Sequence, residues 1–232
     1  MNYKLTNSSA FPLVLITLNS GEEIKTESGA MVYHNGKVTL EGKMNSNGSG
    51  GIGGLLKAAA RSVVSGEGFF VTTAKGNAPD ALIAIAPGSI GQIKELRVGE
   101  TKWCIIDGAF LACDSSVSYN IKRQSVGKAI FGGTGGLFIM ETAGEGTMLV
   151  NGFGDIVEME LDGTSPFVVD NYHVVAWEST LSYDIKAASG MFGFTTGEGV
   201  VNEFTGKGKL LIQTRNISGL AGLVKPFIPT GK

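Results

Sequence analysis

The sequence predicts an all-β protein, and three observations point to this fold class. Glycine accounts for 35 of the 232 residues and charged residues for only 17%, whereas typical soluble domains contain about 7% glycine and about 25% charged residues. Residues 157–161 alternate between apolar and acidic side chains, which is typical of a half-buried strand. One segment also recurs along the chain, which indicates that a strand-forming unit was copied in tandem. We therefore expect three tandem β-sandwich repeats.

The recurring segment is clearest where LACDSSVSYNIK (residues 111–122) matches VAWESTLSYDIK (residues 175–186) at a spacing of 64 residues. A third copy begins 79 residues upstream of the first of these, so that Val32 corresponds to Leu111 and Val175. Units of this length bury too little surface to form a core comfortably alone, so the copies are expected to pack around a pseudo-threefold axis. The predicted units are residues 1–89, 90–154 and 155–216, followed by a C-terminal arm at residues 217–232.

Each predicted repeat contains its strands in the same order. It opens with a strand that ends at a glycine, continues through two strands around a turn and a strand introduced by glycine, and closes on an apolar strand. The opening strands are expected at residues 14–21, 92–99 and 156–163, the glycine-introduced strands at 66–76, 135–144 and 197–206, and the closing strands at 82–88, 148–154 and 210–216. The arm after them contains two prolines and is expected to dock on the body or on a neighbouring subunit.

The first repeat carries an insertion, and residues 50–73 are the only stretch expected to form a helix. Apolar side chains fall on one helical face, and Lys57 and Arg61 lie on the opposite face. This short amphipathic helix is expected to cover an open end of the β body or a trimer axis; the alternatives are a membrane surface or a protein partner. The interaction residues predicted on it are Ile52, Leu55, Leu56, Val63 and Val64.

The two cysteines predict free thiols. Cys104 and Cys113 flank Asp107 and Gly108, a pair that is typical of a two-residue hairpin turn. In that register Cys104 faces Leu111, so the thiols lie diagonal to one another and do not pair. The N-terminal residues lack the features of a signal peptide, and the apolar run at residues 11–18 is too short to span a bilayer. The expected compartment is therefore the reducing cytoplasm.

Motifs for catalysis, cofactors and metals carry little signal. The pattern Gly48-x-Gly50-x-x-Gly53 matches a dinucleotide loop, but no parallel βαβ unit follows it. Gly-x-Ser-x-Gly and C-x-x-C motifs are absent, and the two histidines do not form an H-x-x-x-H pair. The acidic face formed by Glu158, Glu160 and Asp162 is expected to be solvated. We therefore predict no catalytic residue, no cofactor and no metal site, and we expect that the protein is not an enzyme.

The charge distribution disfavours nucleic acid. The formal net charge is −2, with acidic and basic residues mixed along the chain, so the sequence has no basic stripe to neutralise phosphates. One basic column does recur, because Lys43, Lys122 and Lys186 occupy equivalent positions in the three repeats. They are expected to be strand-end lysines facing water. The alternative is a repeated anion or RNA contact.

A family resemblance adds to this interpretation. The glycine-rich loop GSGGIGGLLKAAARSVVSGEGFFVTT and the segments IIDGAFLACDSSV and VVDNYHVVAWEST resemble the altered-inheritance-of-mitochondria family over nearly the whole chain. The resemblance implies a fold similar to the trp RNA-binding attenuation protein, as three fused copies assembled into a homotrimer, and it implies no enzymatic activity. The leading hypothesis is a homotrimeric scaffold or interaction module. The alternatives are peripheral membrane association through residues 52–64 and a ligand- or RNA-binding module with grooves between repeats.

Overall fold

The computed structural model describes residues 1–6, 10–44, 70–106, 108–123, 138–187 and 200–229, and it confirms the predicted all-β class. After β1 (Asn2–Leu5), the described strands form three successive groups of six, which we call the first, second and third set. The first set is β2 (Val14–Leu18), β3 (Glu23–Glu27), β4 (Met31–His34), β5 (Val38–Met44), β6 (Phe70–Gly76) and β7 (Ala81–Ile85). The second set is β8 (Ile93–Val98), β9 (Trp103–Ile106), β10 (Phe110–Asp114), β11 (Val117–Arg123), β12 (Phe138–Gly144) and β13 (Gly146–Asn151). The third set is β14 (Ile156–Asp162), β15 (Phe167–Asp170), β16 (Val174–Glu178), β17 (Ser182–Ala187), β18 (Val200–Thr205) and β19 (Lys207–Gln213).

The strands pair into four antiparallel sheets. Sheet 1 has the order β1-β2-β7-β4, sheet 2 the order β5-β6-β3-β10-β13-β8, sheet 3 the order β11-β12-β9-β16-β19-β14, and sheet 4 the order β15-β18-β17. Each six-stranded sheet therefore combines three strands of one set with three strands of the next. The two sets meet at an antiparallel strand pair, β3 with β10 in sheet 2 and β9 with β16 in sheet 3. We call these two pairs the seams.

The strand pairing recurs in detail from set to set. The third strand of each set pairs with the sixth, and the register shifts at one residue within the pair. That residue is Val32 in β4, Leu111 in β10 and Val175 in β16, the three positions that the sequence repeat aligns. The pseudo-threefold arrangement of the repeats and the predicted unit boundaries stay predictions.

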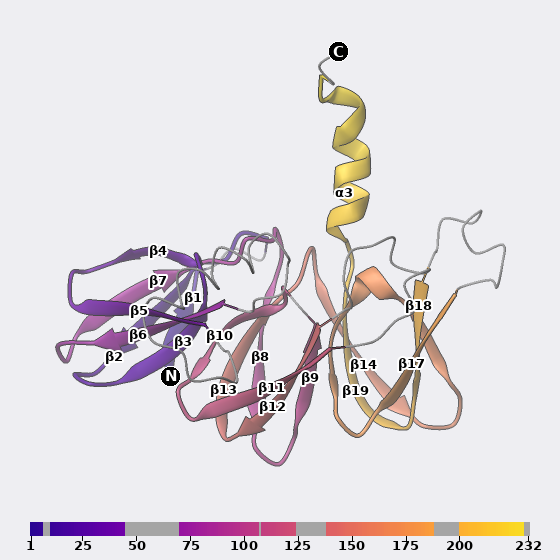
Figure 1. Cartoon of the computed structure of the whole chain (residues 1–232), viewed down its shortest axis with the longest axis horizontal. Helices are drawn as coiled ribbons and strands as arrows, with labels where there is room; N and C mark the ends of the chain where they lie inside the picture. The colour runs from indigo at the N-terminus through magenta and orange to yellow at the C-terminus, as the bar shows by residue number, and fades with distance from the viewer. Residues whose placement is uncertain (7–9, 45–69, 107, 124–137, 188–199, 230–232) are drawn as a thin grey trace.

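Three buried clusters lie between successive sheets, and they hold the sets together. Among the described residues, the cluster between sheets 1 and 2 includes Leu111, the next includes Phe110 and Ile105, and the one between sheets 3 and 4 includes Trp177 and Phe204. Phe110 and Leu111 are neighbours on β10 but contribute to different clusters, so this strand is buried on both faces. In Figure 1 the sheets follow one another along the long axis, with β4 and β7 near one end and β17 and β18 near the other.

The hairpin expected between Cys104 and Cys113 is wrong. The strand β9 lies in sheet 3 and β10 in sheet 2, so the turn before Ala109 is a corner between two sheets. The turn itself is tight, since Ala109 N–H donates to the Ile106 carbonyl at 3.3 Å and Gly108 has a φ of 81°. Instead of pairing with each other, β9 pairs with β12 and β16, and β10 pairs with β13 and β3. Cys104 and Cys113 are not joined by a disulfide, as the sequence predicted.

The expectation that residues 50–73 hold the only helix is also wrong, although residues 45–69 lie outside the described part of the chain. The arm forms the α-helix α3 (Ile217–Val224), followed by the 3₁₀-helix η3 (Lys225–Phe227). A second 3₁₀-helix, η1 (Asn171–His173), links β15 to β16. The sheets end before α3, which extends away from them in Figure 1 and has no buried residue. The predicted docking of the arm on the body is therefore not found, and docking on a neighbouring subunit stays a prediction.

Candidate functional site

Two strands, β4 and β15, end a sheet although the equivalent strands of the other sets lie in the interior of a sheet; we call the latter strands of the interior type. In the seams, β10 and β16 have strand partners on both sides, as do β3 and β9. Their counterparts β4 in the first set and β15 in the third set each have one partner in the described part of the chain, β7 and β18 respectively. We call these the two open edges. The other sheet edges are formed by β1 in sheet 1, by β5 and β8 in sheet 2, by β11 and β14 in sheet 3, and by β17 in sheet 4.

The missing partner leaves apolar side chains of β4 in water. Val32 is 55% exposed, whereas its counterparts Leu111 and Val175 are fully buried (0%). Tyr33 is 45% exposed, whereas the alanine that corresponds to it in β10, Ala112, is also fully buried. All four residues of β4 are exposed, while four of the five residues of β10 are buried. The difference follows from sheet order and not from residue type.

The open edge at β15 borders an aromatic cluster. Val168 is 55% exposed, and the next residue, Val169, is buried in the core between sheets 3 and 4. The ring centroids of Trp177 and Tyr183 lie 4.8 Å apart in that core, and those of Trp177 and Phe204 lie 5.5 Å apart, both with edge-to-face geometry. Burial raises the pKa of Tyr183 to about 12. This edge is therefore the margin of an apolar core.

Charge distinguishes the open edges from the ordinary ones. Lys94 on β8 and Lys209 on β19 both bind Glu158 on the edge strand β14, at 2.7 Å and 2.8 Å. The bonds from Lys209 and then Lys94 hold the pKa of the Glu158 carboxyl below its ordinary value. Charged side chains discourage pairing at sheet edges. The strand β4 has no charged residue, and the one in β15, Asp170, accepts a hydrogen bond from Tyr172 N–H at 2.8 Å.

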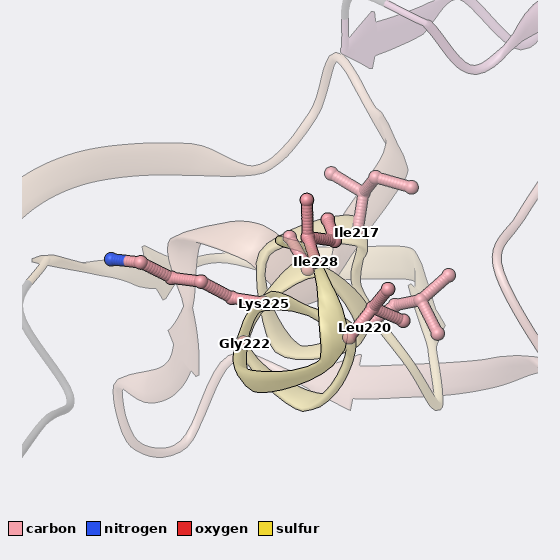
Figure 2. A pocket seen from close by; sticks show the side chains of 7 residues that line it. Ile217, Leu220, Gly222, Lys225 and Ile228 are labelled. Carbon is pink, nitrogen blue, oxygen red and sulfur yellow. The ribbon is translucent and has the colours of Figure 1, made fainter. Parts of the chain in front are cut away.

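The helix α3 is a second apolar surface. Ile217, Leu223 and Phe227 are exposed, Phe227 to 83%, and Figure 2 shows Ile217, Leu220 and Ile228 on the side of the helix away from Lys225. The concave part of this surface has a volume of about 490 Å³. Its lining comes from the helix and the residues that follow it, namely Ile217, Leu220, Ala221, Gly222, Val224, Lys225 and Ile228.

A histidine and an asparagine fix the base of α3. The Asn216 side-chain oxygen accepts a hydrogen bond from Gly219 N–H at 2.7 Å, which makes Asn216 the N-cap of the helix. The Nδ2 atom of Asn216 lies 2.9 Å from Nε2 of His173, and Nδ1 of His173 lies 2.7 Å from the Gln213 carbonyl oxygen. The direction in which α3 leaves the sheets is therefore set by contacts with η1 and β19.

The remaining predicted site residues separate into two groups. The five interaction residues Ile52, Leu55, Leu56, Val63 and Val64 lie outside the described residues. The three equivalent lysines, Lys43, Lys122 and Lys186, lie on the corresponding edge strands β5, β11 and β17. The Nζ atom of Lys186 binds Glu203 at 2.5 Å, so this lysine is already neutralised by a carboxylate.

The described residues also contain no metal-binding group, in the sense of three or more His, Cys, Asp or Glu side chains gathered within reach of one ion. Within the same residues, no helix has the length and apolar character needed to cross a bilayer. The open edges and α3 are therefore the surfaces in the described part of the chain that call for a functional explanation.

The fold and these surfaces define an all-β protein whose sheets are shared between successive strand sets and end in two uncharged or nearly uncharged edges. The chain belongs to the mitochondrial biogenesis AIM24 family, whose model matches residues 3–215, and this confirms the resemblance seen in the sequence. An uncharacterised protein of Streptococcus pyogenes serotype M6 is 47% identical over 231 residues, which cover 99% of this chain and 92% of that protein. The crystal structure of protein SPYM3_0169 from Streptococcus pyogenes is similar with a TM-score of 0.80 and 42% identity, covering 98% of this chain and 99% of that one.

Proposed function

We propose that this protein is a non-enzymatic scaffold or interaction module that works as a homo-oligomer, with three copies as the expected assembly. The observation that carries the proposal is the open edge at β4, where Val32 and Tyr33 are exposed although the equivalent side chains in β10 are buried. An exposed apolar edge strand presents unpaired backbone N–H and C=O groups, which makes it a template for pairing with another chain.

The chemistry of the described residues supports a role without catalysis. Burial raises the pKa of the Cys113 thiol to about 12, so this cysteine is protonated at neutral pH and is a poor nucleophile. His173 is engaged through both ring nitrogens, with the Gln213 carbonyl and Asn216. That Cys104 and Cys113 form no disulfide also supports the proposed location in a reducing compartment.

The mass of the protein in solution tests the homo-oligomer. One chain has a mass of 24.2 kDa, so light scattering after size-exclusion chromatography is expected to give about three times this value for a homotrimer. The measurement covers protein concentrations from roughly 1 to 100 µM, because association depends on concentration. A mass of a single chain at every concentration in this range would refute the proposal.

The helix α3 favours a second candidate function, reversible binding to a membrane surface. Leu223 and Phe227 are among the most exposed apolar side chains of the described residues, and Lys225 is the only charged residue between Ile217 and Ile228. Such a segment can bury its apolar face at the boundary between headgroups and acyl chains. Co-sedimentation with phosphatidylcholine vesicles, with and without anionic lipid, tests this function. Binding is expected for the intact chain and not for a chain that lacks residues 217–232; equal recovery of both chains from the supernatant contradicts it.

A further inference from the structure

We infer that copies of this protein join head to tail, with β15 of one copy paired antiparallel with β4 of the next. This inference rests on the proposed homo-oligomer and assigns the surface that forms it. The open edge at β4 is then covered by β15 of a second copy, and the open edge at β15 is covered by β4 of a second copy. The two open edges lie in sheets 4 and 1, which are at opposite ends of the long axis of the molecule in Figure 1. The two edges of one copy therefore pair with two different neighbouring copies.

The order of the strands shows that the two terminal sheets are complementary halves. Sheets 2 and 3 each consist of the fourth, fifth and second strand of one set, followed by the third, sixth and first strand of the next set. Sheet 4, read as β17-β18-β15, has the first half of this order. Sheet 1, read as β4-β7-β2, has the second half, and β1 extends it by one strand. Joined at β15 and β4, they reproduce the arrangement that the chain already forms twice.

The two internal seams fix the register of the proposed one. Cys113 on β10 pairs with Lys25 on β3, and the equivalent Trp177 on β16 pairs with Cys104 on β9. Both pairs have the same position in their sets, since the spacings of 79 and 64 residues relate them. The same spacings place His34 opposite Val168 in the proposed seam. One position along, Ala112 pairs with Thr26 and Ala176 with Ile105, which places Tyr33 opposite Val169.

The same comparison explains the exposed side chains of β4. Leu111 and Ala112 belong to the cluster between sheets 1 and 2, and Val175 and Ala176 belong to the one between sheets 2 and 3. Each pair therefore enters the core that the preceding set forms. By the same placement, Val32 and Tyr33 enter the core that contains Val169 and Phe204 of the preceding copy.

Tyr33 is larger than the alanines at the two equivalent positions. Its phenol can leave the hydroxyl at the surface while the ring packs against apolar atoms. The proposed seam therefore buries an aromatic ring at a position where both internal seams bury an alanine.

The backbone at the ends of the two edges is compatible with this pairing. At the end of the internal seam between β9 and β16, Ser179 N–H donates to the Lys102 carbonyl oxygen at 2.8 Å. The equivalent residues at the open edges are Gly36 and Pro166, and proline keeps the carbonyl although it lacks the N–H group. In the single chain, the Gly36 N–H donates to Nδ1 of His34 at 3.1 Å. In the proposed seam it donates instead to the carbonyl oxygen of Pro166 in the neighbouring copy.

A head-to-tail contact of this kind is heterologous, so it closes into a ring when the rotation between copies allows and otherwise extends into a filament. The expected homotrimer is the closed case, in which each of three copies uses both of its open edges. No edge of the interior type then faces water. This closure distinguishes the inference from a symmetric dimer, in which two β4 strands or two β15 strands pair with themselves.

The first experiment places a lysine in the proposed seam. Val32→Lys introduces a charge at a position that is 55% exposed in the single chain, whereas the equivalent Leu111 and Val175 are fully buried in the internal seams, so the fold of each copy is retained while the proposed strand pairing is opposed. The expected result is a shift of the mass in solution from the oligomer to one chain of 24.2 kDa. Val157→Lys is the matched control, since Val157 is 38% exposed on the ordinary edge strand β14. An oligomer that persists in Val32→Lys overturns the inference and leaves the proposed homo-oligomer standing.

The second experiment tests partner and register by disulfide formation. His34→Cys and Val168→Cys chains, mixed and oxidised, are expected to give a covalent dimer, because opposite residues of an antiparallel pair have Cα atoms roughly 4.5 to 5.5 Å apart. Either variant alone, and the unmodified chain with Cys104 and Cys113, are expected to stay monomeric under denaturing conditions. His34→Cys mixed with Val169→Cys is the register control, because successive side chains of a strand point to opposite faces.

Three outcomes of the disulfide experiment overturn the inference. A dimer from His34→Cys alone indicates that two β4 strands pair with each other. An equal yield with Val169→Cys indicates contact without the proposed register. An oligomeric protein whose mixed chains give no dimer shows that copies associate through another surface, which refutes the seam but not the homo-oligomer. A protein that has the mass of one chain refutes both.

Discussion

Residues at equivalent positions of the three sets contribute differently to the free energy of unfolding, depending on whether a neighbouring strand covers them. Leu111 is fully buried, and truncating a buried leucine removes apolar contacts and leaves a cavity. We expect Leu111→Ala to lower the free energy of unfolding by about 2–5 kcal/mol. Val32→Ala is expected to change it by less than about 0.5 kcal/mol in the single chain, because Val32 is largely in water. Urea denaturation at low protein concentration measures both; equal losses for the two variants contradict this assignment.

The buried thiol predicts a loss of stability at alkaline pH. Burial raises the pKa of Cys113 from 9.0 to about 12; the charge of Lys25 has a smaller effect that lowers the pKa, and the charge of Asp114 has a smaller effect that raises it. The unfolded chain ionises this thiol at the lower pH, so its contribution to stability is complete below about pH 9 and declines as the pH rises towards 12. The expected loss is about 1.4 kcal/mol per pH unit within this window. Urea midpoints measured between pH 8 and pH 11 give the slope.

A pair of core variants isolates the thiol. Cys113→Ala removes the titrating group and is expected to reduce the alkaline slope, although it lowers stability at neutral pH. Val175→Ala leaves a cavity in the same cluster without removing an ionisable group, so its alkaline slope should equal that of the unmodified protein. Tyr3 and Tyr183, whose pKa values burial raises to about 12, contribute to the residual slope above pH 10. A slope unchanged in Cys113→Ala would show that the thiol is not its source.

At the scale of elements, the sequence predicts the strands well and their partners poorly. The alternation in β14 and the glycines that precede β12 and β18 locate strands because they reflect local backbone and burial preferences. The alternation of apolar and polar side chains locates a strand but does not specify which other strand pairs with it. For this reason the pair around Gly108 was expected to be a hairpin, whereas β9 and β10 pair with strands of neighbouring sets.

The candidate site shows the same limit. The correspondence of Val32, Leu111 and Val175 is visible in the sequence, and it predicts that all three lie on equivalent strands. Only the sheet order reveals that Val32 lies on a strand with a single partner among the described strands. The helix α3 was missed because Gly219 and Gly222 lower its helix propensity, although Asn216 is a recognisable N-cap.

The helix α3 is expected to contribute little to the stability of the sheets. An eight-residue helix without packed neighbours is marginal in water, and none of its residues is buried. Removing residues 217–232 should therefore shift the midpoint of thermal unfolding by no more than about 2 °C, within the range of surface changes. Differential scanning calorimetry of the two chains measures the shift. A much larger decrease would indicate that α3 packs against a neighbouring copy in the assembled protein.

At the scale of the whole molecule, the sets depend on one another because each internal core contains strands from two sets. The cluster between sheets 1 and 2 includes Ile83 from the first set and Leu149 from the second. The cluster between sheets 2 and 3 includes Met148 from the second set and Leu211 from the third. A truncation at a predicted unit boundary therefore exposes a core, and the three sets are expected to unfold together in a single cooperative transition.

The strand pairing proposed between copies makes thermal stability depend on protein concentration. Association stabilises the folded chain by mass action, so a tenfold increase in concentration above the dissociation constant contributes at most about 1.4 kcal/mol per contact. For a chain of this length, that corresponds to an increase of roughly 3–6 °C in the unfolding midpoint. The unmodified protein and Val157→Lys are expected to show this increase for each tenfold step between about 1 and 100 µM. Val32→Lys is expected to unfold at one temperature throughout this range, because its copies are already separate. A midpoint that is independent of concentration in all three proteins, with a constant oligomeric mass, would mean that the copies remain associated after the sheets unfold, which strand pairing at β4 and β15 does not permit.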